Sequence, residues 1–175
     1  MVACRGGTFY SGQSFTTPSS GGPWDDITFN FYSDAPPTTP LAAGAAFLLN
    51  QAYSGAPADL SSSTTGFLAE STGITGGVYD FPIDLVLQPG TQYFLYEDAI
   101  LGPSGGNVIS GGVFYEATDA GADFAPFEGE SANFTVSGDV ASVVPEPSTW
   151  ALMALGFGLL GGAGYWRRRS VAVAA

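Results

Sequence analysis

The sequence predicts an all-β protein: an antiparallel β-sandwich of the jelly-roll or immunoglobulin-like kind, followed by one C-terminal transmembrane helix. Three observations predict this. Short apolar runs alternate with Gly, Pro, Ser and Asp through residues 1–143. No amphipathic helix of three turns precedes residue 147. Residues 147–166 then form an uncharged stretch.

Composition removes several classes of function. The chain has 175 residues, a length that suits one domain with a short appendage, and its formal net charge is −12. It contains no His and no Lys, which excludes His-based acid–base catalysis and Lys Schiff bases. Its four basic residues are Arg5 and residues 167–169, so residues 6–166 carry no positive charge. Such a surface repels phosphate, and nucleic acid is therefore excluded as a partner.

The clearest strand is predicted after Asp26. Ile27, Phe29 and Phe31 alternate with Thr28 and Asn30, which is the period-2 pattern of a strand with one buried face. Three prolines are expected to end this strand: Pro36, Pro37 and Pro40.

Two β-rich runs flank a Pro-Gly turn. Val78–Leu87 precedes Gln88-Pro89-Gly90-Thr91, and Gln92–Glu97 follows it. A turn of this composition can reverse the chain, so we predict a hairpin or a corner at which the chain changes sheets.

Weaker strands are predicted where shorter apolar runs are bounded by Gly, Ser, Asp or Pro. These are Gln13–Thr17, Ala45–Asn50, Gly66–Ser71, Val113–Glu116 and Ala132–Val136. The total of seven or eight short strands favours two antiparallel sheets packed face to face. A closed barrel remains an alternative, because strand order leaves no mark in one sequence.

Two segments of low complexity are predicted to be solvated loops, namely Ser61–Thr65 and Gly102–Gly112. For the Ser/Thr run, O-glycosylation is the alternative.

The C-terminal stretch is predicted to cross a membrane over about residues 148–166. A helix of 20 residues is about 30 Å long and matches the hydrocarbon core of a bilayer. Trp150 and Trp166 lie at its ends, and the membrane-stop residues Arg167, Arg168 and Arg169 follow. The positive-inside rule then places residues 171–175 in the cytoplasm and residues 1–143 outside. A buried core helix is the alternative, although the segment has no polar face.

Pro145-Glu146-Pro147 stands directly before this helix. The tripeptide, the apolar helix and the arginine cluster at the C-terminus together resemble the PEP-CTERM sorting signal of Gram-negative bacteria, over residues 144–170. The resemblance implies that an exosortase, a membrane-embedded cysteine protease or transpeptidase, recognises Pro145, Glu146 and Pro147. It implies an exported protein that is held by its helix, processed, and delivered to the surface or to an exopolysaccharide matrix. In this role the motif is a substrate and not a catalyst.

The N-terminus departs from the family pattern. Exported members begin with a signal peptide, whereas residues 1–7 contain no apolar run, and we expect a leader upstream of this start. A lipoprotein cleavage site at Cys4 is the less favoured alternative. Cys4 is expected to be a free thiol, because the chain has no second Cys to pair with it.

No enzyme, catalytic residue or cofactor is predicted. Acidic pairs do occur, at Asp25-Asp26, Glu97-Asp98, Asp119 with Asp123, and Glu128 with Glu130. A two-carboxylate glycosidase needs two such groups across a cleft, and nothing in the sequence sets that spacing. The acidic residues from 119 to 130 could supply oxygen ligands for a structural Ca²⁺, but they lack the EF-hand pattern, and a solvated acidic loop without a metal is favoured.

Aromatic residues suggest one further activity. Most are expected in the core, yet an exposed flat cluster would stack on sugar rings, and the candidates are Trp24, Tyr32, Tyr53, Tyr79, Tyr96 and Tyr115. The sequence therefore predicts a structural or interaction protein of the cell surface or exopolysaccharide matrix, with a carbohydrate-binding module as the alternative. Coplanar aromatics exposed on one sheet face would favour the alternative.

Overall fold

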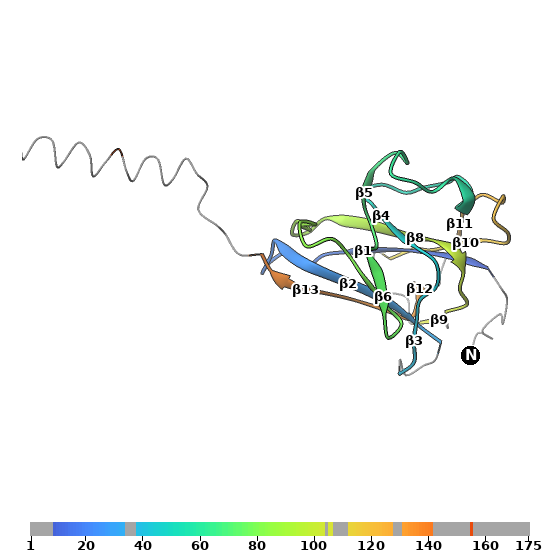
Figure 1. Cartoon of the computed structure of the whole chain (residues 1–175), viewed down its shortest axis with the longest axis horizontal. Helices are drawn as coiled ribbons and strands as arrows, with labels where there is room; N and C mark the ends of the chain where they lie inside the picture. Colours follow the sequence, from blue (N-terminus) through green and yellow to red (C-terminus); the bar gives the residue numbers. More distant parts are fainter. Residues whose placement is uncertain are drawn as a thin grey trace, which may run out of the picture. The chain divides into compact units, whose positions relative to one another are not determined.

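The computed structural model describes residues 9–33, 38–103, 105–106, 112–127, 131–141 and Leu155. The chain divides into two compact units, residues 1–141 and residues 142–175. The described strands all lie in the first unit (Figure 1). Within the described residues the only helical element besides Leu155 is a short 3-10 turn, Pro57–Asp59. The predicted all-β antiparallel architecture is confirmed for this part of the chain.

The larger sheet, sheet A, has six antiparallel strands. In spatial order they are β11 (Ala125–Phe127), β10 (Phe114–Ala117), β1 (Tyr10–Thr16), β8 (Gln92–Ile100), β4 (Ala46–Leu49) and β5 (Phe67–Glu70).

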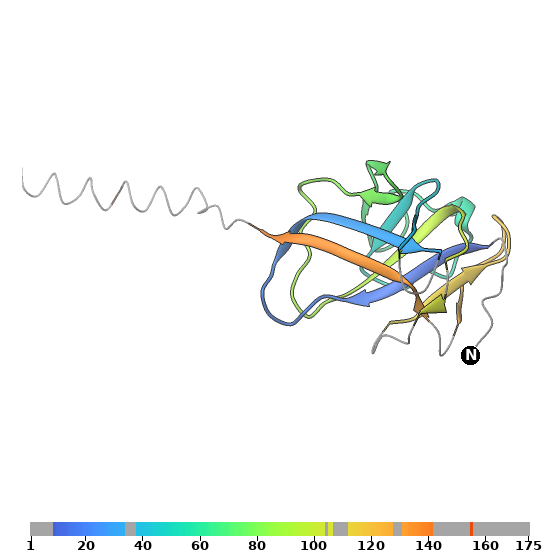
Figure 2. The same ribbon diagram turned by 90° about the horizontal axis from the view of Figure 1, so that it is seen from below.

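The second sheet, sheet B, is built around the long strand β2. Its order is β13 (Phe134–Val140), β2 (Trp24–Tyr32), β7 (Val78–Asp80) and β6 (Gly73–Thr75), and β3 (Pro40–Leu41) pairs with the end of β2. Figure 2 shows β13 running beside β2 along most of its length. A separate pair consists of β12 (Ser131–Ala132) and β9 (Gly105–Gly106).

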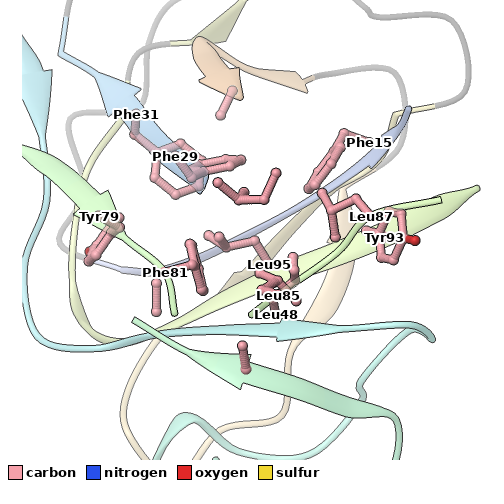
Figure 3. Close-up of a cluster of buried hydrophobic side chains, with 14 of the residues drawn as sticks. Phe15, Phe29, Phe31, Leu48, Tyr79, Phe81, Leu85, Leu87, Tyr93 and Leu95 are labelled. Carbon is pink, nitrogen blue, oxygen red and sulfur yellow. The ribbon is translucent and has the colours of Figure 1, made fainter. Parts of the chain in front are cut away.

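The main core lies between the two sheets (Figure 3). Sheet B contributes Phe29 and Phe31, and sheet A contributes Phe15, Leu48 and Leu95, all of which are buried. The predicted inward face of β2 is confirmed, because its alternate residues from Ile27 are at most 2% exposed. The two sheets thus face each other across a shared apolar layer, as the sandwich prediction requires. A finer assignment as jelly-roll or immunoglobulin-like stays a prediction.

A second cluster covers the other face of sheet A. It is centred on Tyr96, whose ring lies 4.8 Å from that of Phe124 and 5.3 Å from that of Tyr115. Sheet A is therefore buried on both faces, and its central strand β1 shows no alternation of burial. The buried polar side chains of β1 are hydrogen-bonded instead. Gln13 Oε1, for example, accepts the N–H of Ala132 at 2.9 Å.

Two strand predictions were wrong. Val78–Leu87 is not one strand: after β7 the chain turns at Pro82, whose carbonyl accepts the Leu85 N–H, and only Leu87 returns to bridge Trp24. The next strand, β8, lies in sheet A, so residues 88–91 form the predicted corner and not a hairpin. Proline, which lacks an N–H, explains the interruption.

The predicted strand Ala132–Val136 is two strands in different sheets, β12 and β13, with a break at Asn133. Pro40 does not stop a strand but begins the short edge strand β3, where a missing N–H is tolerated. Pro36 and Pro37 lie outside the described residues. The described part of the chain holds 13 strands, more than the seven or eight predicted, because several are only two or three residues long.

Candidate functional site

The predicted sorting motif and membrane segment belong to the second unit. Pro145, Glu146, Pro147 and residues 167–169 lie outside the described residues, as does the predicted span except Leu155, which is helical. No helix among the described residues is long and apolar enough to cross a membrane. The single-pass topology thus stays a prediction.

In the sequence, the described part of the folded domain ends a few residues before the motif. The last strand, β13, ends at Val140, and the N–H of Ala141 donates to the carbonyl of Pro23 at 2.9 Å. Only residues 142–144 separate this hydrogen bond from Pro145. The backbone is therefore anchored within four residues of the predicted processing signal.

The side chains of Glu97 and Asp98 do not face a common cleft. Glu97 and Asp98 are neighbours in a strand, so their side chains point to opposite faces of the sheet. Glu97 is fully buried, whereas Asp98 is exposed and its Oδ1 accepts the Ala45 N–H. Asp119 Oδ1 accepts the N–H of Gly121 within its own turn. No group of three potential ligands that could hold a metal occurs among the described residues, and Glu128 and Glu130 are not among these.

None of the six candidate aromatics forms an exposed platform. Tyr79, Tyr96 and Tyr115 are buried, whereas Trp24, Tyr32 and Tyr53 are half-buried. In the described part of the chain no aromatic side chain is classed as exposed. The stacking surface that would have favoured a carbohydrate-binding module is not found there.

A different feature, a polar hollow, lies beside the second core cluster. It is lined by residues 51–55, Asp59 and residues 63–65, and its volume is about 390 Å³. One lining residue, Tyr53, connects the hollow to the core: its N–H donates to Tyr96 Oη at 3.0 Å, and its Oη donates to the Ala56 carbonyl at 3.0 Å. The Tyr53 ring also packs 5.7 Å from that of Tyr96.

The hydroxyl-rich wall of the hollow is held by its own hydrogen bonds. Thr64 Oγ1 accepts the N–H of Ser61 at 3.0 Å, and the hydroxyls of Ser61 and Ser63 lie 2.8 Å apart. The loop closes at Gly66, which has a φ of 81° and whose carbonyl accepts the N–H of Asn50. A side chain at this position would be strained by that φ and would press on Gln51.

Four polar side chains at this hollow form no hydrogen bonds with the described part of the protein. Gln51, Ser54, Asp59 and Thr65 make no side-chain hydrogen bond within the described part of the chain, and all four are exposed. Burial raises the pKa of Tyr53, and the nearby carboxylates of Asp59 and Asp123 raise it further, so the phenol stays neutral. The hollow thus offers neutral donors and acceptors beside one carboxylate, an arrangement that suits hydroxyl groups and repels anions.

Sequence reasoning found only part of this hollow. Ser61–Thr65 was predicted as a solvated loop, and Ser62, Ser63 and Thr65 are exposed. Gln51 and Asp59 carried no signal, because Gln51 lies in an irregular segment, Asp59 ends the 3-10 turn, and both line the hollow only in the folded chain.

A buried acid is the other unusual group. Glu97 of β8 is fully buried, and its Oε1 is hydrogen-bonded to Tyr79 Oη of β7 at 2.7 Å. Its Oε2 has no partner. Burial raises the pKa of Glu97 well above its ordinary value and Asp98 adds to the rise, whereas a hydrogen bond donated by Tyr79 to the ionised carboxylate would oppose it.

Comparison with known proteins identifies the C-terminal segment. Residues 143–169 match the family model of the PEP-CTERM protein-sorting motif, in agreement with the predicted resemblance. No curated protein and no solved structure gives a significant match to the chain. The motif implies an exported protein of the cell envelope or surface that is sorted by an exosortase.

Proposed function

We propose that the acidic β-domain is the cargo of this sorting signal: a structural or interaction protein that is displayed at the cell surface or in an exopolysaccharide matrix. Before processing, the apolar segment holds the chain as a single-pass membrane protein with the β-domain outside. The match at residues 143–169 is the observation that carries this proposal.

The position of the motif supports processing there. The last backbone hydrogen bond among the described residues of the domain, from Ala141 to Pro23, lies four residues before Pro145. From the sequence, Pro145 and Pro147 are expected to favour an extended peptide at the motif, because proline disfavours the helical conformation in the residue before it and cannot donate a helical hydrogen bond. Glu146 supplies the only charge between Asp139 and Arg167, so an exosortase can recognise a carboxylate within an extended backbone.

Replacing Glu146 by Ala should block processing. In an exosortase-bearing host, with a leader supplied upstream, we expect the E146A protein to accumulate as a longer, membrane-retained form. Immunoblots of membrane and surface fractions would measure this.

Asp139→Ala is the matched control, since it removes the nearest carboxylate on the domain side, from the exposed end of β13. This variant should be processed like the parent chain. Normal trimming and release of E146A would contradict the sorting function of the motif.

The polar hollow favours a second function for the displayed domain, weak binding of a neutral polysaccharide. The unused groups of Gln51, Ser54, Asp59 and Thr65 can pair with sugar hydroxyls. The Asp59 carboxylate can accept hydrogen bonds from them, and the Gln51 amide can both donate and accept. Residues 6–166 contain no positive charge, so uronate or phosphate groups would be repelled. The half-buried Tyr53 would serve as a wall of the site.

Binding can be measured by affinity electrophoresis in gels that contain dextran, a neutral polysaccharide, or alginate, an acidic one. We expect retardation by dextran alone and a loss of about tenfold in affinity for Asp59→Ala, because a charge-assisted hydrogen bond is removed. Asp84→Ala, at an exposed acid outside the hollow, should bind like the parent chain. Equal retardation of all three proteins, or binding of alginate, would contradict this second function.

A further inference from the structure

We propose that Glu97 is a proton-operated latch: as a neutral acid it helps hold the segment where the chain crosses from one sheet to the other, and it releases that segment when it loses its proton. The proposal concerns the β-domain itself and does not depend on the sorting function.

The latch sits at a crossover. Residues 42–45 connect β3 of sheet B to β4 of sheet A. Tyr79 Oη binds both backbone groups of Ala43: it accepts the N–H at 2.8 Å and lies 2.7 Å from the carbonyl oxygen. Because Tyr79 belongs to sheet B and Glu97 to sheet A, their 2.7 Å contact links the two sheets at the same point.

Counting protons shows which group must donate. The Tyr79 phenol has one proton and can accept two hydrogen bonds. It has three close neighbours: the Ala43 N–H, the Ala43 carbonyl and Glu97 Oε1. All three contacts are hydrogen bonds at once only if the phenol donates to the carbonyl and accepts from both the N–H and Glu97. Glu97 then carries a proton on Oε1, and Oε2 is the uncharged oxygen that lacks a partner.

The surroundings contain no charge that would favour the ionised form. β4, which flanks Glu97, and residues 42–45 contain no titratable group, and β1 on the other side contains only Tyr10, opposite Ile100. From β7 the facing group is Tyr79, and on β8 itself the neighbour is Asp98. Residues 6–166 include no Lys, Arg or His, so no described residue of the domain supplies a cation that could pair with a Glu97 carboxylate.

Ionisation would break the arrangement. If Glu97 is ionised, the Tyr79 hydroxyl donates to the carboxylate, and the Ala43 carbonyl then loses its hydrogen-bond donor. The carboxylate, including Oε2, is also a buried negative charge without a compensating cation. Burial raises the pKa of Tyr79 too, with Glu97 adding to the rise, so the phenol keeps its proton throughout.

The sign of the pH effect follows from the raised pKa of Glu97 in the folded state. A folded-state pKa above the unfolded value, about 4.3, means that the folded protein binds the proton more tightly. The stabilisation is therefore fully present below that value and is lost as the pH rises through the folded-state pKa. The contribution of Glu97 to the free energy of unfolding should therefore be largest at acidic pH.

Urea unfolding of the full chain at a series of pH values tests the latch. For one proton, the folding equilibrium constant falls by about tenfold per pH unit between the two pKa values, in addition to the general effect of net charge. Glu97→Gln keeps a donor for Tyr79 Oη and cannot ionise. Its folding equilibrium constant should therefore lack this tenfold fall per pH unit. Glu70→Gln, at an exposed acid of β5 in the same sheet, should retain the parent slope. Equal slopes for the parent and Glu97→Gln would overturn the proposal.

Infrared spectroscopy of the unmodified chain gives a second readout that does not depend on any variant folding. At pH 7, where exposed carboxyl groups are ionised, we expect the carbonyl stretch of one protonated carboxylic acid, which should disappear as the pH is raised. The absence of this band at pH 7 and at pH 6 would contradict a neutral Glu97.

Discussion

Replacing Phe29 by Ala is expected to lower the free energy of unfolding of the β-domain by about 3–5 kcal/mol. Phe29 is 1% exposed and belongs to the core cluster between the sheets (Figure 3). Its ring stacks on that of Phe134 at 5.3 Å, meets that of Phe31 edge-on at 4.9 Å, and lies 6.1 Å from that of Phe15. Truncation removes these ring contacts and leaves a cavity that three strands border.

A loss of that size is a large part of the stability of an ordinary domain, about 5–15 kcal/mol. Urea unfolding, followed by circular dichroism, would measure it. Ile83→Ala is the control, because Ile83 is 82% exposed in the loop after β7, and its truncation should change the free energy of unfolding by at most about 0.5 kcal/mol. Similar losses for both variants would mean that the layer around Phe29 is not the main core.

Replacing Gly12 by Ala is expected to cost about 1–3 kcal/mol, although it adds only one methyl group. Gly12 lies in β1 opposite Tyr96 of β8 on one side and Tyr115 of β10 on the other. A Cβ there would be 2.7 Å from Tyr96 Cε1 and 3.1 Å from Tyr115 Cβ. The Tyr96 ring cannot move aside easily, because it is fully buried and its hydroxyl accepts the Tyr53 N–H.

Gly73→Ala is the matched control for this substitution. Gly73, in the edge strand β6, has no atom within 4 Å of the position of a Cβ and no positive φ. The same added methyl should therefore be neutral or should stabilise by about 0.4–1 kcal/mol, through the lower entropy of the unfolded chain. Thermal unfolding of both variants would show the opposite signs, and a tolerated Gly12→Ala would contradict the packing of Tyr96 over β1.

Prediction from sequence succeeded where local pattern and burial agree. The strand at residues 27–32 has one face toward the core, so its alternation is visible in the sequence, and each of the seven other predicted segments contains at least part of a strand. It failed where pairing is decided by distant segments. The short strands β3, β6 and β11 have no signal of their own, since each is defined by the partner it reaches.

The sorting signal, by contrast, was readable from the sequence alone. It consists of a short motif, an apolar stretch and an arginine cluster that are contiguous in the chain, so no folding is needed to bring its parts together. The charge of the domain was readable for the same reason, and it gives the expectation that the domain does not bind nucleic acid.

Only the tertiary structure decided the chemistry of the β-domain. The sequence shows Glu97 and Asp98 as an ordinary acidic pair, and the fold makes one a fully buried group with a raised pKa and the other an exposed hydrogen-bond acceptor. Tyr79, which is 18 residues away in sequence, becomes the partner of Glu97 because two sheets meet face to face at the crossover. The polar hollow likewise joins Gln51 and Asp59 to a serine–threonine loop. Net charge and contiguous motifs are properties of the linear sequence, so they can be read without a structure. The burial and the protonation state of a side chain depend on which distant strands exclude water around it.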